Sequence, residues 1–280
     1  MKNELANPTF EEKWFFETYG YLILENFLSI DHVIRLKQKL LESIDKRITQ
    51  GSGHLFKKEY SEHLSPERRN DPSDPYTLVE GKNVRAFSIL NDDPVFLELL
   101  DYSKIMPYIY HFLSKNPHFH ASDAIWEKEN QRNSPGWHRD GADDGYEQFL
   151  PNIPLLQLKI GYILSDMLEE DYGNLILVPA SHNNTMVLNK EDPRLKEFNG
   201  LPGSIQICAS AGTAILFHNA LWHTSGYWGK GKSIERIMLY YAYEHNWMLA
   251  NSEFMAYPKS FYDCLSEGQK LMFHGFANKF

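Results

Sequence analysis

The first third of the chain carries apolar residues at helical spacing between polar ones. Residues 7–19 end at Gly20, which predicts a short helix closed by a glycine C-cap. After an extended apolar run, Ser29 is the expected N-cap of a helix that continues to about residue 48. A further helical stretch is expected over about residues 93–113, with an interruption near Pro107. Four apolar residues mark the buried face of the helix after Ser29: Val33, Leu36, Leu40 and Ile44.

The pattern changes after Pro117, where short β-rich runs alternate with turn residues. Strands that recur at such intervals are typical of a β-sandwich or a barrel. The runs are FHASDAIWEK, LLQLKIGYIL, GNLILVPAS, GSIQICA, GTAILFHNALWHTSGY and RIMLYYAYEH. A last short helix is expected near the end of the sequence, with Ser266 as its N-cap.

These patterns predict an α+β protein with a single domain over residues 1–280. Its core is expected to be a double-stranded β-helix, a cupin-like jelly roll, over about residues 117–246. N-terminal and middle helices over about residues 1–115 are expected to pack on this core, and residues 247–280 form a C-terminal helical extension. Residues 49–80 are polar and rich in Gly, Pro and Asp, which predicts a long loop of the kind that is either a lid or disordered.

Composition excludes several classes of function. The 28 basic and 37 acidic residues give a net charge of −9, which argues against binding to a nucleic-acid backbone. Cys208 and Cys264 do not form a CxxC pair, so neither a disulfide framework nor a thiolate zinc site is expected. Neither an apolar signal core nor an apolar run long enough for a membrane span occurs. We therefore expect a cytoplasmic protein, monomer or homodimer, whose partner is a small molecule.

Candidate chemistry begins at GWHRDGADDG, residues 136–145. His138 and Asp140 are two residues apart, and in a strand such residues point to the same face. Two histidines and one carboxylate on one face of an octahedron form the iron site of non-haem Fe(II) oxygenases. A late strand offers two candidates for the second histidine, His218 and His223. We prefer His223 and interpret His218 as a packing histidine beside the site.

A charged residue near this site favours a co-substrate with a carboxylate. Arg236 follows His223 by 13 residues and begins the last strand. A planar guanidinium can hold a carboxylate through two parallel hydrogen bonds. Ser225 is two residues from His223, on the same strand face, where its hydroxyl can add a further hydrogen bond. Arg139 lies between the two ligands of the motif and is expected to point away from the metal.

Four segments in order resemble the phytanoyl-CoA dioxygenase family of Fe(II)- and 2-oxoglutarate-dependent oxygenases. They are FFETYGYLILENFLS, GWHRDG, YGNLILVPASH and LFHNALWHTSG…ERIMLYYAY, and the resemblance extends from about Phe10 to His245. It implies the same jelly-roll fold, with Fe(II), 2-oxoglutarate and O₂ as reactants. The residues that it assigns are His138, Asp140 and His223 as iron ligands, and Arg236 with Ser225 as the binding site of the distal carboxylate of 2-oxoglutarate.

The same resemblance implies two further contacts to 2-oxoglutarate. Arg85 in VRAFSILNDDPVF matches a basic residue that the family often has, and Tyr162 in KIGYILSD matches a cofactor-lining aromatic. The sequence departs from the family where Tyr172-Gly173 replaces the usual Asn-Gly and where Ala180 replaces a glycine. These departures concern the rim of the pocket rather than the predicted ligands.

We interpret the chain as a small-molecule hydroxylase that releases succinate and CO₂. Halogenating relatives replace the carboxylate ligand by a small residue, so Asp140 favours hydroxylation or a related oxidation such as desaturation or ring formation. Two alternatives are a jelly-roll metal sensor without oxygenase activity, and metal-assisted hydrolysis, which leaves Arg236 without a role. Loop residues 51–80 and 141–153 are candidates for closing over the substrate. Candidate substrate-pocket aromatics are Trp126, Tyr146 and Trp228.

Overall fold

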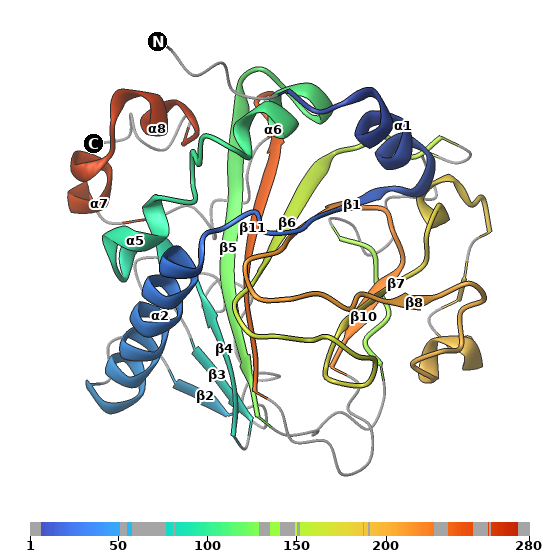
Figure 1. Cartoon of the computed structure of the whole chain (residues 1–280), viewed down its shortest axis with the longest axis horizontal. Helices are drawn as coiled ribbons and strands as arrows, with labels where there is room; N and C mark the ends of the chain where they lie inside the picture. Colours follow the sequence, from blue (N-terminus) through green and yellow to red (C-terminus); the bar gives the residue numbers. More distant parts are fainter. Residues whose placement is uncertain are drawn as a thin grey trace.

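The chain folds around two β-sheets that pack face to face, with helices on the outer side of the larger one (Figure 1). This computed structural model describes a defined set of residues. They are 7–50, 55–57, 77–80, 82–128, 135–140, 149, 152–186, 188–189, 191–226, 235–248, 257 and 259–273. Helices on a two-sheet core form the α+β arrangement predicted from the sequence.

The larger sheet has eight strands in the order β1-β9-β6-β11-β5-β4-β3-β2, and the smaller has the order β10-β7-β8. Neighbouring strands are antiparallel except for the parallel pair β2 and β3. The large-sheet strands are β1 (Tyr21–Leu24), β2 (Leu55–Lys57), β3 (Thr77–Glu80), β4 (Asn83–Phe87), β5 (Pro117–Glu127), β6 (Gln157–Ile163), β9 (Ala214–His218) and β11 (Arg236–His245). The small-sheet strands are β7 (Leu175–Leu177), β8 (Ile205–Gln206) and β10 (His223–Ser225).

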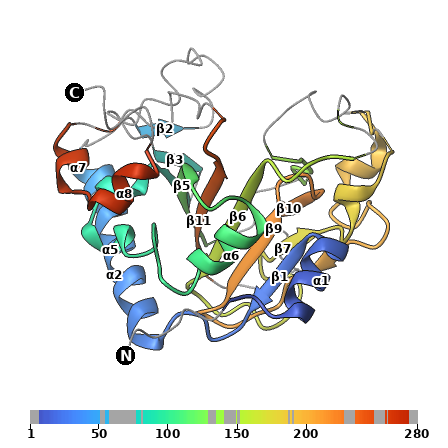
Figure 2. The ribbon, with the colours of Figure 1, turned by 90° about the horizontal axis from the view of Figure 1, so that it is seen from above.

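Helices cover one face of the large sheet. Seen from above, α2, α5, α7 and α8 group on one side of the molecule and α1 lies beside β1 on the other (Figure 2). The helices are α1 (Phe10–Tyr19), α2 (Ile30–Gln50), α5 (Pro94–Leu97), α6 (Met106–Phe112), α7 (Lys259–Cys264) and α8 (Glu267–Leu271). Short 3₁₀ turns are η1 (Ile89–Asn91), η3 (Ser181–Asn183) and η4 (Pro193–Lys196). None of the helices in the described part of the chain is long and apolar enough to cross a membrane.

The predicted helix ends are present. Thr9 forms a capping box with Glu12, and Gly20 ends α1 in the left-handed conformation, with φ of 80°. The Ser29 hydroxyl accepts a hydrogen bond from the His32 amide at 3.2 Å at the start of α2. Ser266 forms a second capping box with Gln269. The four apolar residues predicted for one face of α2 are all buried: Val33, Leu36, Leu40 and Ile44.

Two expectations for the first third are wrong in detail. The helical stretch over residues 93–113 is two short helices, α5 and α6, and Pro107 lies in the first turn of α6 rather than inside a helix. The segment expected as a loop over residues 49–80 begins with the last two residues of α2 and contains strands β2 and β3, and the rest of it lies outside the described residues. Four strands before residue 115 therefore extend the large sheet beyond the predicted core.

Strand parity gives the two faces of the large sheet different roles. On β11 the residues Ile237, Leu239, Tyr241 and Tyr243 belong to the core under the helices. Met238 belongs to the core between the two sheets, where it meets Leu175 of β7 and Phe217 of β9. Since successive side chains of a strand point to opposite faces, Arg236, Tyr240, Ala242 and Glu244 share the inner face with Met238.

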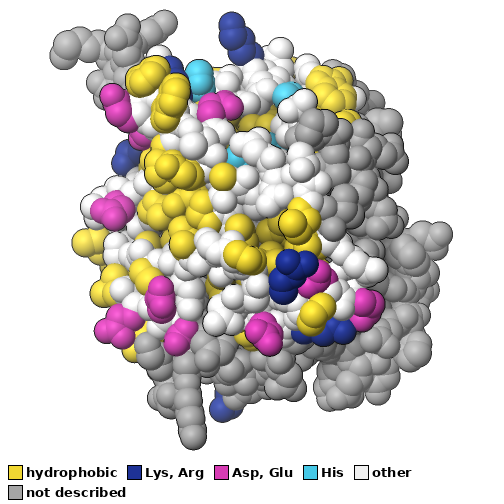
Figure 3. Space-filling view, turned by 90° about the vertical axis from the view of Figure 1, so that its right-hand side faces the viewer, with side chains coloured by type: hydrophobic (Ala, Val, Ile, Leu, Met, Phe, Trp, Pro, Cys, Tyr) yellow, Lys and Arg dark blue, Asp and Glu magenta, His cyan; other side chains and the backbone are white. Residues whose placement is uncertain are grey.

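The surface also exposes apolar side chains. Figure 3 shows hydrophobic side chains grouped on the face at the right of Figure 1, with carboxylates mostly around them. On α1, Phe10 and Trp14 are among the exposed large hydrophobic residues, and their ring centroids are 6.0 Å apart. This i, i+4 pair supports the helix locally, because side chains at that spacing are neighbours on a helix surface.

Candidate active site

His138, Asp140 and His223 meet on the inner side of the large sheet. His138 and His223 are paired by two backbone hydrogen bonds of 3.1 Å, one in each direction. Each of the three residues offers one ligand atom, and these atoms lie within 4.8 Å of one another. Asp140 and His223 are buried, whereas the His138 side chain is 53% exposed. The site therefore opens to its surroundings on the side of His138.

Backbone carbonyls orient both imidazoles. The Nδ1 of His138 lies 2.6 Å from the Gly136 carbonyl oxygen, and the Nδ1 of His223 lies 2.9 Å from that of Leu221. A carbonyl oxygen only accepts, so each Nδ1 carries the proton and each Nε2 is left as a ligand. These Nε2 atoms are 3.5 and 3.4 Å from the two oxygens of Asp140.

These donor atoms fit a divalent transition metal. Oδ2 of Asp140 is buried and has no hydrogen-bond partner within the described residues. A buried carboxylate oxygen without a donor is costly, and a cation between it and the two Nε2 atoms removes that cost. Two imidazoles and one carboxylate, with one open side, are the ligand set of non-haem iron oxygenases.

Electrostatics keep Asp140 and His223 in the ligand form. Burial raises the pKa of Asp140, but Lys159, His223 and His138 outweigh burial and hold that pKa well below its usual value. Burial, together with His138, lowers the pKa of His223 to about 3, although Asp140 opposes the shift. At neutral pH the site therefore presents an ionised carboxylate and a neutral buried imidazole, as metal binding requires.

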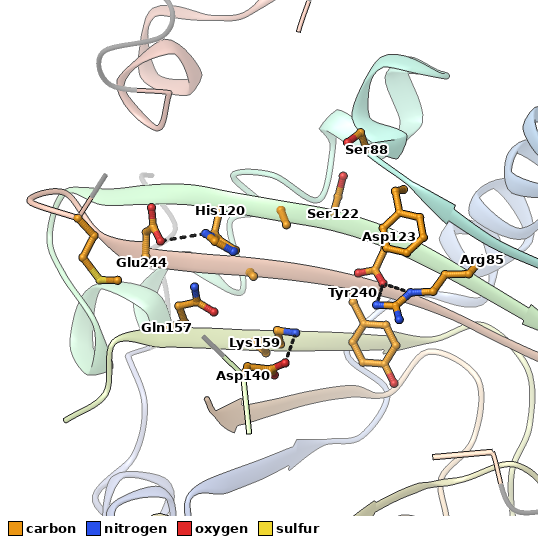
Figure 4. A pocket seen from close by; sticks show the side chains of 14 residues that line it. Arg85, Ser88, His120, Ser122, Asp123, Asp140, Gln157, Lys159, Tyr240 and Glu244 are labelled. Atoms are coloured by element: carbon orange, nitrogen blue, oxygen red, sulfur yellow. Dashed lines mark hydrogen bonds and ion pairs between the residues drawn. The ribbon is translucent and has the colours of Figure 1, made fainter. Parts of the chain in front are cut away.

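Lys159 is a site residue that the sequence did not reveal. Its Nζ lies 2.9 Å from Oδ1 of Asp140, and it projects from the middle of β6 (Figure 4). Gln157, Lys159 and Gly161 share one face of β6, and the apolar residues between them face the helices. The sequence does carry a signal for it: Gln157 and Lys159 are polar residues at alternate positions within an otherwise apolar run.

Two adjoining cavities open beside the three ligands. The larger has a volume of about 500 Å³, within the range of small-molecule sites, and the smaller has about 70 Å³. Asp140 lines the larger cavity, and both histidines line the smaller one. The side chains that line both cavities are those of Arg85, Asp123, Lys159 and Tyr240.

Two of the residues predicted to contact 2-oxoglutarate line these cavities. Ser225 lines the smaller cavity, beside Thr224. Arg85 points from β4 toward Asp123 of β5, and its Nε and Nη2 atoms lie 2.8 and 2.5 Å from Oδ2 of that carboxylate (Figure 4). Arg85 is therefore an arginine at the site whose charge is balanced locally.

Arg236 lies deeper than the cavity linings. It is fully buried, its Nη1 lies 2.7 Å from Oε2 of Glu127, and its Nη2 donates to the Tyr240 hydroxyl at 3.1 Å. Burial opposes the charge, but Glu127 and Tyr240 outweigh it and raise the pKa of Arg236. The guanidinium thus contacts a residue of the smaller cavity, Tyr240, without lining the cavity itself. Its Nε–H is left without an acceptor among the described residues.

Two predicted residues face the wrong way for the site. Tyr162 is fully buried on the helix side, where its ring centroid is 5.7 Å from that of Tyr241. Trp126 also packs against the helix-side core, and its Nε1 donates to Glu235 at 2.6 Å. Both have the parity opposite to that of the inner-face residues, so neither lines the cavities. Tyr146, Trp228 and most of the proposed closing segments lie outside the described residues.

The remaining residues of the two motifs are also placed. His218 contacts His182 at a ring distance of 4.8 Å, and its Nδ1 accepts from the Ala220 amide at 3.0 Å. Burial and His182 lower the pKa of His218 to about 3. The Arg139 guanidinium lies 4.8 Å from the centre of the Trp222 ring, outside the residues that line the cavities. This arrangement agrees with a packing role for His218 and an outward Arg139.

Comparison with known proteins supports the same interpretation of the fold. A model of the family described as phytanoyl-CoA dioxygenase (PhyH) matches residues 16–227. HygX from Streptomyces hygroscopicus, solved with nickel, 2-oxoglutarate and hygromycin B, is similar with a TM-score of 0.64 at 15% identity, over 86% of this chain and 89% of that chain. EctD from S. alaskensis, solved with 2-oxoglutarate and 5-hydroxyectoine, has a TM-score of 0.61 at 18% identity, over 88% and 78%.

A third solved structure extends the range of reactions seen on this fold. SnoK, a non-haem α-ketoglutarate-dependent carbocyclase from nogalamycin biosynthesis, has a TM-score of 0.59 at 15% identity, over 85% of this chain and 84% of that chain. These likenesses confirm the jelly-roll fold predicted from the sequence. A search of curated proteins gave no match.

Proposed function

The chain belongs to the phytanoyl-CoA dioxygenase family, and on this premise we propose that it hydroxylates a small-molecule metabolite with Fe(II) and 2-oxoglutarate. The observation that carries the proposal is the group of His138, Asp140 and His223 at the edge of a cavity of about 500 Å³. In the proposed reaction, 2-oxoglutarate loses CO₂, and O₂ supplies one oxygen atom to the succinate and one to the new hydroxyl group of the substrate.

His138, Asp140 and His223 would hold the iron. When bound with 2-oxoglutarate and O₂, the iron supplies the oxidising chemistry that protein side chains lack. The side chains contribute a fixed ligand geometry, since both imidazoles are held by backbone carbonyls. Lys159 adds a positive charge at Asp140, which keeps that carboxylate ionised and restricts its rotation.

The smaller cavity offers the co-substrate polar partners beside the metal ligands. Lys159 and the Arg85–Asp123 pair line it, and Ser225 and Tyr240 add hydroxyl groups. We assign the distal carboxylate of 2-oxoglutarate to Ser225, Tyr240 and the guanidinium of Arg236 behind them, whose Nε lacks a partner among the described residues. A charge-assisted hydrogen bond to a buried guanidinium is stronger than a neutral one, which favours this assignment.

Asp140 supports hydroxylation over halogenation. A halogenating site needs an open metal position where this chain has a carboxylate, and that carboxylate is buried and ionised. The neighbouring structures HygX and EctD were solved with hygromycin B and with 5-hydroxyectoine, both small polar molecules. They support a small, polar metabolite as the substrate of this chain.

An anaerobic titration tests the proposal. Addition of Fe(II) and 2-oxoglutarate to the purified protein is expected to give a visible metal-to-ligand charge-transfer band, and aerobic incubation with the substrate is expected to release succinate. Asp140→Ala should give the band only at much higher Fe(II) concentration, whereas the exposed His111→Ala, on α6, should match the wild type. A wild-type protein without the band contradicts the proposal.

A further inference from the structure

A bulge in β5 brings one histidine to the wall of the larger cavity. The register between β11 and β5 shifts after Ala242, which is paired with Ala121, whereas Tyr243 is paired with Phe119. His120 is the inserted residue between these pairs. Phe119 remains in the helix-side core, and His120 lines the cavity. A bulge next to an active site is a known means of re-aiming a side chain.

Glu244 fixes the orientation of His120. The Nδ1 of His120 donates to Oε2 of Glu244 at 2.9 Å, and the two side chains point toward each other in Figure 4. The other oxygen, Oε1, lies 3.3 Å from Nδ1 of His118. Burial raises the pKa of Glu244, but the two imidazoles outweigh burial and lower that pKa to about 2. The carboxylate therefore stays ionised, and the proton on Nδ1 of His120 leaves Nε2 as the polar atom of the outer ring edge.

Strand register places this histidine close to the metal ligands. Glu244 is paired with Gln157 across β6, and Ala242, two residues earlier, is paired with Lys159. At about 3.3 Å per residue, these two rows of the sheet are roughly 6.6 Å apart. Since Lys159 contacts Asp140 at 2.9 Å, a molecule that spans two rows touches the histidine at one end and reaches the metal ligands at the other.

Small side chains form the floor between the two rows. Ala121 and Ala242 are paired and both line the larger cavity. Their methyl groups leave space that any longer side chain would fill. The walls are mixed, because Gln157 and Glu244 stand at one end and the Arg85–Asp123 pair at the other, while Phe87 and Met248 add apolar side chains.

We propose that His120, held by Glu244, selects the substrate through a hydrogen bond to one of its hydroxyl or amino groups. The substrate class is then a metabolite with a hydroxyl or amino group at this end, which the acyl chain of a fatty acid or an acyl thioester lacks. This inference rests on the proposed function, because it assigns the end of the substrate that lies away from the oxidised carbon. His120 acts here as a specificity-determining residue and not as a metal ligand.

A spectroscopic panel tests the assignment. The protein loaded anaerobically with Fe(II) and 2-oxoglutarate is titrated with glucosamine, glucose, myo-inositol, 4-hydroxyproline, decanoic acid and decanoyl-CoA. Binding beside the metal is read as a shift of the charge-transfer band, and turnover as succinate release. We expect at least one of the first four compounds to shift the band and neither of the decanoyl compounds to do so.

Three variants separate recognition from folding. His120→Phe keeps a ring but loses the hydrogen bond, and the responding compound should bind about 10- to 100-fold more weakly. His120→Gln keeps a side-chain hydrogen-bonding group and should recover part of the affinity. The matched control His111→Phe lies on the exposed face of α6 and should bind as the wild type does. All three should retain the charge-transfer band, which shows an intact metal site.

The outcomes distinguish a failure of the proposed function from a failure of the role assigned to His120. A wild-type protein with no charge-transfer band contradicts the proposed function itself. A normal band that responds to none of the four polar compounds overturns the assignment of His120 alone. So does equal affinity of the responding compound for the wild type and for His120→Phe.

Discussion

The two faces of the large sheet are formed by the same strands but differ in the chemistry of their side chains. On the helix side of β11, Leu239, Tyr241 and Tyr243 are fully buried, and the Tyr241 and Tyr243 hydroxyls donate to the carbonyl oxygens of Phe96 and Leu100 at 2.7 Å. On the inner side, the same strand presents a buried arginine, a tyrosine and a glutamate. The helix side thus contributes apolar burial, and the inner side contributes charge.

The inner face shows how charges are tolerated next to a core. Each of its charged side chains has a partner of opposite or complementary chemistry in the described structure. The pairs are Arg236 with Glu127, Lys159 with Asp140, Arg85 with Asp123, and Glu244 with His118 and His120. A buried ion pair adds little stability by itself, but the loss of one partner is costly. The inner face is therefore the more sensitive of the two faces to single polar changes.

Removal of the metal carboxylate should have the largest effect on function. Asp140→Ala deletes one of three ligands and leaves Lys159 without its carboxylate. Iron affinity should fall by more than about 100-fold, since even the partners of metal ligands contribute 10- to 100-fold, and turnover should be lost. Titration with Fe(II) and succinate release measure this. Normal turnover in Asp140→Ala would contradict the placement of the reaction at the inner face.

Neutralisation of Glu127 should reveal the cost of the buried arginine. Glu127→Gln leaves the fully buried Arg236 without its anion, and the free energy of unfolding should fall by about 3–5 kcal/mol. The dianion 2-oxoglutarate should then stabilise the variant more than it stabilises the wild type, because it restores a carboxylate near Arg236. Urea unfolding with and without 2-oxoglutarate measures both effects. If 2-oxoglutarate raised the free energy of unfolding equally in the two proteins, Arg236 would not be part of the co-substrate site.

Shortening an apolar side chain on the helix side should reduce stability and leave metal binding unchanged. Leu239 is fully buried among the helix-side residues, and Leu239→Ala should lower the free energy of unfolding by about 2–5 kcal/mol. At temperatures where the variant is folded, its affinity for Fe(II) should equal that of the wild type. A large loss of metal affinity without a loss of stability would mean that the two faces are not separable.

Acid should weaken the inner face through Glu244. Its pKa is lowered from 4.5 in a model compound to about 2, so the carboxylate stabilises the fold above pH 4.5, and this contribution is lost as the pH falls toward 2. At neutral pH, Glu244→Gln should cost up to about 3 kcal/mol of unfolding free energy. The difference between wild type and variant should shrink between pH 4.5 and pH 2, as urea unfolding at several pH values can show. If the difference in unfolding free energy between wild type and Glu244→Gln stayed constant with pH, the pKa of Glu244 would not be lowered by its histidine partners.

A surface pair should give the smallest effect. Arg35 binds Glu98 through two hydrogen bonds of 2.9 and 2.8 Å, but the Arg35 side chain is about half exposed. Arg35→Ala should change the free energy of unfolding by about 0.2–1 kcal/mol, the range of exposed ion pairs. Thermal unfolding at low and high salt measures it. A loss as large as that of Glu127→Gln would mean that burial does not decide the cost.

The ligand motif could be found from the sequence because its chemistry is local. His138 and Asp140 are two residues apart in one strand-like segment, and the spacing from His223 to Arg236 marks the last strand. The structure brings one ligand atom from each of the three predicted ligands within 4.8 Å of the others. Helix caps such as Gly20 and Ser266 were found for the same reason, since a cap depends only on its neighbours in sequence.

The residues that were misplaced depend on pairing between distant strands. Tyr162 and Trp126 were expected at the site, but strand parity turns them toward the helices. Lys159 was missed because two polar residues at alternate positions of an apolar run show that they share a face, but not which face of the sheet it is. His120 reaches the cavity only because a bulge opposite Ala242 and Tyr243 shifts the register. That register is set by residues more than a hundred positions away.

The position of the metal tests the central claim most directly. Crystals grown anaerobically with Fe(II) and 2-oxoglutarate, measured at the iron absorption edge, show where iron binds. We expect an anomalous peak between Nε2 of His138, a carboxylate oxygen of Asp140 and Nε2 of His223, with 2-oxoglutarate extending from it toward Ser225. An iron peak elsewhere, or no peak at these three residues, would contradict it.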